Sequence, residues 1–160
     1  MIVHSKDFVT NLDEACIQPN AVDLRLRSIS VIGDQSCITI SETTKEFISR
    51  IQLKPKDGWF VLRANTTYDV LSRNDVHIPA GMCGWLIIRS TLARNGVILS
   101  GGLYDSNFRG QIGCVLHNTM NTDIQVESNL RFAQFIMAKA ETDHLYQGFY
   151  NKPNSNPHTV

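Results

Sequence analysis

Short runs of alternating residues, separated by turn residues at regular intervals, are the feature that most constrains the fold of this chain. Val22–Val31 alternates most strictly, and its candidate inward positions are Val22, Leu24, Leu26 and Ile29 to Val31. Further short runs with strand composition are Cys37–Ile40, Trp59–Leu62, Thr67–Leu71, Met82–Ile88, Gln111–His117, Asp123–Val126 and Phe132–Ala138. Neither a βαβ rhythm nor a repeat is present. The pattern therefore predicts an all-β sandwich, jelly roll or barrel.

Two short helices are expected beside these strands. Ser5–Ala15 opens on a residue type that caps helices and places its apolar side chains on one helical face. A second helix would begin at Ser90, directly after an apolar strand. The length of 160 residues suits one domain. We expect residues 1–141 to form a single β domain and residues 142–160 to form a flexible tail that could cover an active site.

Charge and hydropathy exclude several classes of protein. The 15 Lys and Arg residues balance 15 Asp and Glu residues, so no global field draws the chain to nucleic acid or to a membrane. No apolar run approaches the roughly 20 residues that span a bilayer. Met1–Asp7 lacks the apolar core of a secretion signal, which favours a cytoplasmic location. The four cysteines are widely spaced and have no histidine at ligand spacing, which argues against structural zinc.

An apolar strand runs directly into two arginines and two hydroxyl residues in Ile87–Gly96. Hydroxyls and free N–H groups at a helix start, beside Arg89 and Arg94, can bind an anion such as phosphate. The alternative is structural, with Ser90 capping the helix and Arg89 paired with a surface acid. The segment alone does not decide between the two.

Glycines frame a second segment, Gly101–Gly110, which has the composition of a β-hairpin. It carries one carboxylate, Asp105, and one aromatic ring, Phe108, three positions apart. A hairpin allows a flat base to pair with backbone amides while a ring covers it. The alternative is an ordinary β-turn in which Asp105 is only a turn residue.

Together with two further segments, these strings resemble the motifs of the dUTPase and dCTP deaminase superfamily, in the same order and at compatible spacing. The four segments are Ile17–Leu26, Arg89–Gly96, Gly102–Asn118 and Leu130–Gln134. They cover about residues 17 to 138. The resemblance implies a distorted jelly roll or β-barrel of the dUTPase type. It also implies a homotrimer whose active sites are shared between subunits.

The resemblance assigns a role to each matching position. Asp105 would be the carboxylate that orients and activates the attacking water. Phe108 would replace a tyrosine that stacks under the deoxyribose and excludes a 5-methyl group, and Gly113 would offer backbone hydrogen bonds to the pyrimidine. The phosphates would be bound by Ser90, Thr91 and Gln134, with Arg89 and Arg94 near them. Asp23 and Arg131 would be scaffold, as one buried ion pair that fixes the site.

One departure from the deaminases bears on the reaction. Their corresponding strand ends in a glutamate that shuttles protons at the amino-bearing carbon, because deamination needs a group that takes and returns a proton. Val115 occupies that place here, and no acid occurs between Asp105 and Asp123. The sequence therefore favours diphosphate release over deamination of dCTP.

The expected activity is the hydrolysis of a deoxynucleoside triphosphate, dUTP, to dUMP and diphosphate. Mg²⁺ would reach the site through substrate oxygens and water, with no direct protein ligand. Tyr104 and Phe108 depart from the dUTPase spelling, so dCTP, dTTP or a modified pyrimidine stays open as substrate. A nucleotide-sensing protein without turnover is a further alternative. The dUTPases also have a fifth, glycine-rich motif near the C-terminus. Only Tyr146–Tyr150 resembles it here, and within this segment Phe149 could close over the base.

Overall fold

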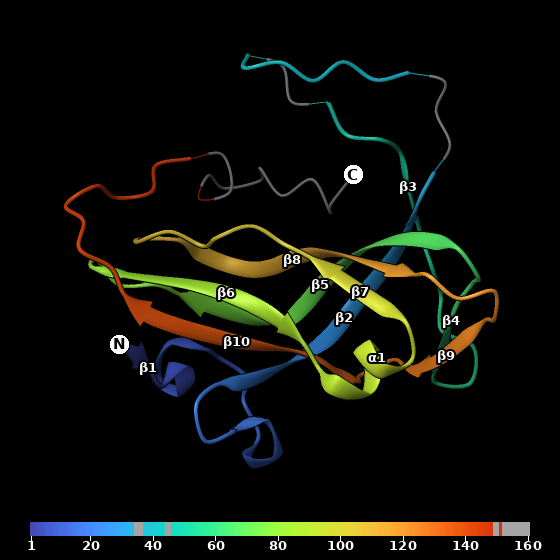
Figure 1. Ribbon diagram of the computed structural model, residues 1–160, viewed down its shortest axis with the longest axis horizontal. Helices are drawn as coiled ribbons and strands as arrows, with labels where there is room; N and C mark the ends of the chain where they lie inside the picture. The colour runs from blue at the N-terminus through green and yellow to red at the C-terminus, as the bar shows by residue number, and fades with distance from the viewer. Residues whose placement is uncertain (34–36, 44–45, 149–150, 152–160) are drawn as a thin grey trace.

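The computed structural model describes residues 1–33, 37–43, 46–148 and 151, and it is a curled antiparallel sheet (Figure 1). Eight strands form the main sheet, in the order β1-β10-β2-β5-β8-β7, with β3 paired to β2 and β6 paired to β10. A two-stranded ribbon of β4 and β9 completes the strands of the described chain. The all-β prediction is therefore confirmed.

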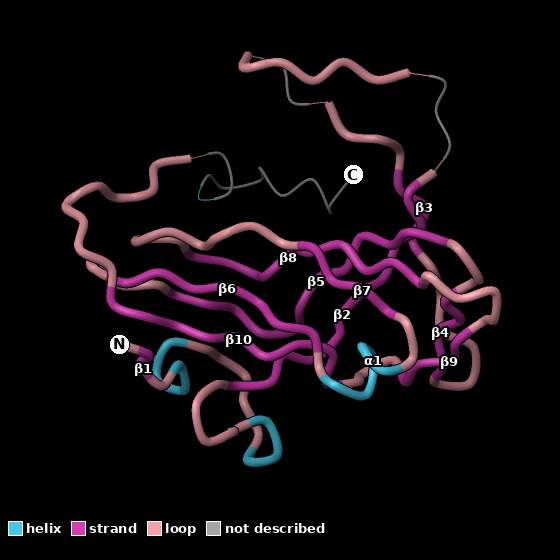
Figure 2. The backbone as a smooth tube through the Cα atoms, viewed as in Figure 1, coloured by secondary structure: helices cyan, strands magenta, loops and turns pink. Residues whose placement is uncertain are grey.

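The elements have the following bounds. The strands are β1 (Ile2–Val3), β2 (Val22–Ile32), β3 (Arg50–Gln52), β4 (Trp59–Leu62), β5 (Thr66–His77), β6 (Met82–Ile88), β7 (Val97–Ser100), β8 (Arg109–Asn118), β9 (Ile124–Glu127) and β10 (Arg131–Lys139). The helical elements, drawn in cyan in Figure 2, are the 3-10 helices η1 (Ser5–Phe8) and η2 (Glu14–Cys16) and the α-helix α1 (Ser90–Arg94). None of the helices in these described ranges is long and apolar enough to cross a bilayer.

The strands share one apolar core. Its largest fully buried side chains are Tyr68, Phe132, Phe135, Leu24, Ile29, Leu62, Ile78, Ile112, Leu116, Met137, Val22 and Val70. Val22, Leu24, Leu26 and Ile29 of the strict alternation are buried, as predicted, whereas the other two candidate inward positions, Ser30 and Val31, are only half-buried. Burying these side chains removes apolar surface from water, which is the main force that holds the curled sheet together.

The N-terminal helix is shorter than the sequence suggests. Ser5 does not cap it: the ring of His4 accepts a hydrogen bond from the Lys6 backbone N–H. The Ser5 side chain is buried instead, and its hydroxyl donates to the Phe135 carbonyl at 2.9 Å. The helix ends before Val9, which forms a β-bridge with Val76. Contacts with the sheet therefore outweigh the local helical pattern.

The strand predictions miss β1, β3 and β7 altogether, and they fail at two further places. Cys37–Ile40 forms no strand, and Ile40 is 74 % exposed. β5 runs beyond the predicted Thr67–Leu71 to His77, through a register shift between Leu71 and Asp75. The added part of β5 is mostly polar and was not predicted as a strand. It pairs with β8 nevertheless, and this long pairing brings β5 to the wall of the candidate site.

Candidate active site

A cavity of about 510 Å³ opens between the hairpin that follows β7, the strands β5 and β8, and the start of β3 with the residues before it. Its lining residues are Phe47, Arg50, Asp69, Ser100, Gly101, Gly102, Leu103, Tyr104, Asp105, Phe108, Gly110, Gln111, Gly113, Cys114, Val115 and Tyr146. Three of the residues assigned by resemblance, Asp105, Phe108 and Gly113, therefore face one space. The volume is in the range of a small-molecule site.

The hairpin that carries Asp105 is fixed by its own backbone. The Phe108 N–H donates to the Asp105 carbonyl at 3.0 Å, and Asn107 adopts a positive φ of 73°, which asparagine tolerates better than most residues. Ser106 is buried, and its hydroxyl donates to the Met82 carbonyl on β6 at 2.6 Å. Asp105 itself is exposed at the rim of the cavity. Its carboxylate is thus accessible on a turn that is held in place.

Two aromatic rings form the buried end of the hairpin. Phe108 is 7 % exposed and makes an edge contact with Tyr104, with 5.2 Å between the ring centroids. The Tyr104 hydroxyl donates to the Gly113 carbonyl on β8 at 2.7 Å. In a strand the N–H and C=O of one residue point to the same edge, so the Gly113 N–H points to this edge as well. The bulky Tyr104 is therefore anchored beside the segment expected to meet the base.

The C-terminal segment contacts the hairpin of its own chain. The Tyr146 N–H donates to the Ser106 carbonyl at 2.7 Å, and its ring packs at a tilt against Phe108, with the centroids 6.2 Å apart. Asn151 exchanges hydrogen bonds with the hairpin backbone at 3.0 and 2.8 Å. Phe149, the residue expected to cover the base, lies outside the described residues.

The residues expected to bind phosphate form a second group, away from the cavity. Arg89 is the N-cap of α1, and the exposed residues Ser90, Thr91 and Arg94 lie on that helix, which confirms the helix predicted after the Arg-Ser-Thr motif. Gln134 is half-buried on the neighbouring strand β10. None of these five residues is among those lining the cavity in the described part of this chain. The described part of the chain thus holds the candidate residues in two separate groups.

A buried carboxylate joins the strands beneath the second group. Asp23 is fully buried, and its Oδ2 atom lies 3.2 Å from both Arg89 Nε and Arg131 Nη1. The expected pair of Asp23 and Arg131 is present, and Arg89 shares it. Arg89 also donates to the Arg131 carbonyl at 3.2 Å. Asp23 Oδ1 has no hydrogen-bond partner among the described residues.

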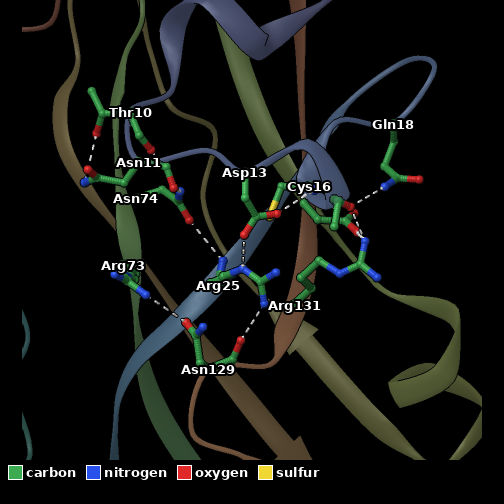
Figure 3. Close-up of polar contacts among 12 residues, drawn as sticks. Thr10, Asn11, Asp13, Cys16, Gln18, Arg25, Arg73, Asn74, Asn129 and Arg131 are labelled. Carbon is green, nitrogen blue, oxygen red and sulfur yellow. Dashed lines mark hydrogen bonds and ion pairs between the residues drawn. The ribbon is translucent and has the colours of Figure 1, made fainter.

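The loop before β2 is tied to the same region by polar contacts, which Figure 3 shows from one side. Arg25 pairs with Asp13 at 2.8 Å and donates to the Asn129 carbonyl at 2.9 Å. The hydrogen bond from Arg25 holds the pKa of Asp13 below its usual value. Arg131 donates to the backbone carbonyl of Ala15 in the same loop. These contacts fix β2, which carries Asp23.

Two charged residues in the cavity, Arg50 and Asp69, were not predicted from the sequence. Arg50 and Asp69 form an ion pair at 2.6 Å, and the Asp69 side chain is only 6 % exposed. Asp69 on β5 is the direct partner of Val115 on β8, so an acid does lie beside Val115, although none is near in sequence. The next residue along β8 towards the N-terminus, Cys114, is buried, and burial raises the pKa of its thiol to about 12, which keeps it uncharged.

Comparison with known proteins places this fold in a family. Residues 2–140 match the sequence profile of the dCTP deaminase-like family. The chain belongs to this family. Its relatives include a probable deoxyuridine 5′-triphosphate nucleotidohydrolase of Methanosarcina barkeri, 27% identical over 145 residues, with 89% of this chain and 84% of the relative covered. A dCTP deaminase of Pyrobaculum arsenaticum is 33% identical over 134 residues, which cover 84% of this chain and 76% of the relative.

Solved structures show the same fold at lower identity. A 2′-deoxycytidine 5′-triphosphate deaminase from Agrobacterium tumefaciens superposes with a TM-score of 0.61 at 19% identity, covering 82% of this chain. The aligned part is only 43% of the Agrobacterium chain. A dUTPase variant of Staphylococcus bacteriophage 80alpha gives a TM-score of 0.53 at 15% identity, with 88% of this chain and 94% of the dUTPase covered. The expected jelly-roll architecture of the dUTPase type is confirmed.

Proposed function

We propose that this protein hydrolyses dUTP to dUMP and diphosphate. The observation that carries the proposal is the cavity that brings together Asp105, Phe108 and Gly113, with Val115 in its wall. Relatives of this family include both dUTP nucleotidohydrolases and dCTP deaminases, so the cavity residues must decide the reaction. A cavity with an exposed carboxylate at its rim and rings at its buried end suits a nucleotide whose base and sugar lie inside while the phosphates on the sugar extend to the rim.

Asp105 is the group that acts on the reacting atoms. Its carboxylate accepts a hydrogen bond from a water molecule, orients that water towards the α-phosphorus and takes up its proton. The fixed hairpin keeps the carboxylate in position before the substrate arrives, which avoids the cost of ordering it during the reaction. Phe108 packs against the sugar, and the hydrogen bond from Tyr104 to Gly113 holds the strand edge to which the base pairs.

The phosphates lie against the second group of residues. Arg89 and Arg94 provide positive charge there, and Ser90, Thr91 and Gln134 provide hydrogen bonds. The separation of the two groups within one chain supports a homotrimer in which the cavity of one subunit meets α1 of another. Mg²⁺ belongs to this proposal, since bound to the phosphate oxygens it would supply charge stabilisation. A cytoplasmic location, which the sequence suggests, is also part of the proposed function.

Deamination of dCTP is the second candidate, because Asp69 places a carboxylate opposite Val115. A deaminase acid must give its proton to the leaving ammonia and take one from water. Asp69 is instead engaged with Arg50 through the 2.6 Å ion pair. We therefore favour diphosphate release, and ammonia release is the measurement that separates the two reactions.

The test is turnover of dUTP, dCTP, dTTP and dATP with Mg²⁺, with diphosphate and ammonia measured separately. We expect diphosphate from dUTP and no ammonia from any substrate. No diphosphate from any of the four would overturn the proposal. Shared sites are tested by mixing Asp105→Asn chains with Arg94→Ala chains at low substrate concentration. Activity should return in the mixed trimers, because some sites then combine an intact Asp105 with an intact Arg94.

A further inference from the structure

The Arg50–Asp69 ion pair forms one wall of the cavity. Arg50 Nε lies 2.6 Å from Asp69 Oδ2, and the two side chains are 19 % and 6 % exposed. Because Asp69 is the direct partner of Val115 across β5 and β8, both side chains lie on the face that borders the cavity. Desolvating two charges costs free energy that their attraction often fails to return, so a buried pair is weak evidence for stability. Its place beside the cavity suggests a role in recognition.

Arg50 is held on three sides. Besides Asp69, its Nη1 donates to the Ile48 carbonyl at 3.2 Å, and its guanidinium carbon lies 5.1 Å from the centre of the Phe47 ring. The contacts with described residues use the Nε–H and one N–H of Nη1. A guanidinium has five N–H donors and no acceptor, so further donors remain in a planar group whose orientation is fixed.

The rest of this wall offers no comparable donor. The neighbouring lining side chains are apolar or uncharged, and Arg50 is the one cation among the lining residues in the described ranges. The Asp69 carboxylate already accepts a hydrogen bond from the Nε–H of Arg50, whereas the Arg50 guanidinium has N–H groups beyond those used by Asp69 and the Ile48 carbonyl. A ligand edge that presents an oxygen acceptor to this wall is therefore favoured over one that presents an amino group.

We propose that Arg50 selects the base by donating to a ring keto oxygen, so that the cavity prefers uracil to cytosine. Cytosine carries an amino group where uracil carries the second keto oxygen, and two donors facing each other leave both unpaired. Asp69 is a positioning residue that orients the guanidinium. This inference rests on the proposed function, in which the base occupies this cavity.

The test measures binding of α,β-imido-dUTP and α,β-imido-dCTP by calorimetry, so that it does not depend on turnover. The wild type should favour the uracil analogue by roughly 10- to 100-fold, as expected for one charge-assisted hydrogen bond. Arg50→Gln should lose that preference, and Arg50→Lys should keep only part of it because the planar fork is gone. Arg63→Gln is the matched control, since Arg63 forms a similar 2.6 Å pair with Asp123 on the exposed surface. It should leave the preference unchanged.

Several outcomes would overturn the inference. They are an unchanged preference in Arg50→Gln, equal binding of the two analogues by the wild type, and no binding of either. Thermal unfolding of each variant identifies misfolding, and if Arg50→Gln does not fold, the partial loss in Arg50→Lys carries the test. Diphosphate release by the wild type is measured in parallel. If dUTP yields diphosphate but Arg50 has no effect on the preference for the uracil analogue, only this inference is rejected. If the protein prefers the uracil analogue through Arg50 but releases no diphosphate, only the proposed function is rejected.

Discussion

Arg89 and Arg131 approach the same oxygen of a single buried residue, Asp23, at 3.2 Å each. Arg89 precedes α1, Arg131 begins β10, and Asp23 lies on β2, so one carboxylate joins three elements. Two of these elements carry residues proposed to bind phosphate. The position of α1 relative to β10 therefore depends on a charge that no solvent reaches.

Asp23→Asn should lower the free energy of unfolding by about 3 kcal/mol, because removing one partner of a buried ion pair leaves the other charge uncompensated. Here two arginines would lose their counter-charge. Urea unfolding followed by fluorescence measures the change. Asp13→Asn is the control, since its pair with Arg25 is on the surface and its loss should have a much smaller effect. Equal effects of the two substitutions would show that Asp23 has no special structural role.

Asp105→Asn should reduce the rate of diphosphate release by roughly 100-fold or more while the substrate still binds. The amide keeps the shape of the side chain but cannot take a proton from water. Single-turnover kinetics and calorimetry with the unreactive dUTP analogue measure the two quantities separately. Asp7→Asn, at another exposed aspartate, should leave both unchanged. Near-full turnover in Asp105→Asn would reduce Asp105 to a turn residue.

The sequence was informative for several local signals, although the shortened N-terminal helix shows that contacts with the sheet can outweigh a local pattern. The alternation of β2 and the bounds of β6, together with the helix after Ile88, follow from residues near one another in the chain. Asp69 was missed because its place depends on pairing with Val115, 46 positions later, which no local pattern shows. The polar end of β5 was missed because buried polar residues such as Asn74 resemble a turn, although Asn74 bonds to three backbone groups.

Arg94→Ala should raise the KM for dUTP by roughly tenfold or more, with little effect on binding of deoxyuridine. Arg94 is exposed at the end of α1, so the substitution removes a phosphate contact without opening the core. Steady-state kinetics and nucleoside binding give the two values. Arg27→Ala removes an exposed arginine elsewhere and should change neither. A parallel loss for nucleotide and nucleoside would mean that Arg94 is structural.

Cys114 should resist alkylation in the folded protein, because burial raises its pKa to about 12 and the thiolate is the reactive form. Iodoacetamide at pH 8.5 should label the exposed Cys37 first and Cys114 only after denaturation, as peptide mass spectrometry can show. Because its pKa is raised, the buried Cys114 thiol contributes fully to the stability of the fold below about pH 9. This contribution is lost as the pH rises towards 12 and the folded thiol ionises. Rapid labelling of Cys114 in the native protein would contradict the burial of its thiol.

Val115→Glu places a carboxylate where the deaminases have one, yet it should neither release ammonia from dCTP nor leave stability unchanged. The new carboxylate would lie directly opposite Asp69, and Arg50 can neutralise only one of the two charges. Like charges opposite one another in a sheet are destabilising, by up to about 1 kcal/mol for one cross-strand pair. The loss should shrink at acidic pH, where one carboxyl group takes up a proton.

Val115→Gln is the matched control for Val115→Glu, because glutamine has the same shape as glutamate but carries no charge. Thermal unfolding of both variants at pH 5 and pH 8 gives the stability change, and an ammonia assay with dCTP gives the activity. A stable, ammonia-releasing Val115→Glu would show that one carboxylate is all that separates the two reactions in this cavity. A destabilised and inactive Val115→Glu beside a normal Val115→Gln would show that the Arg50–Asp69 wall excludes a second acid.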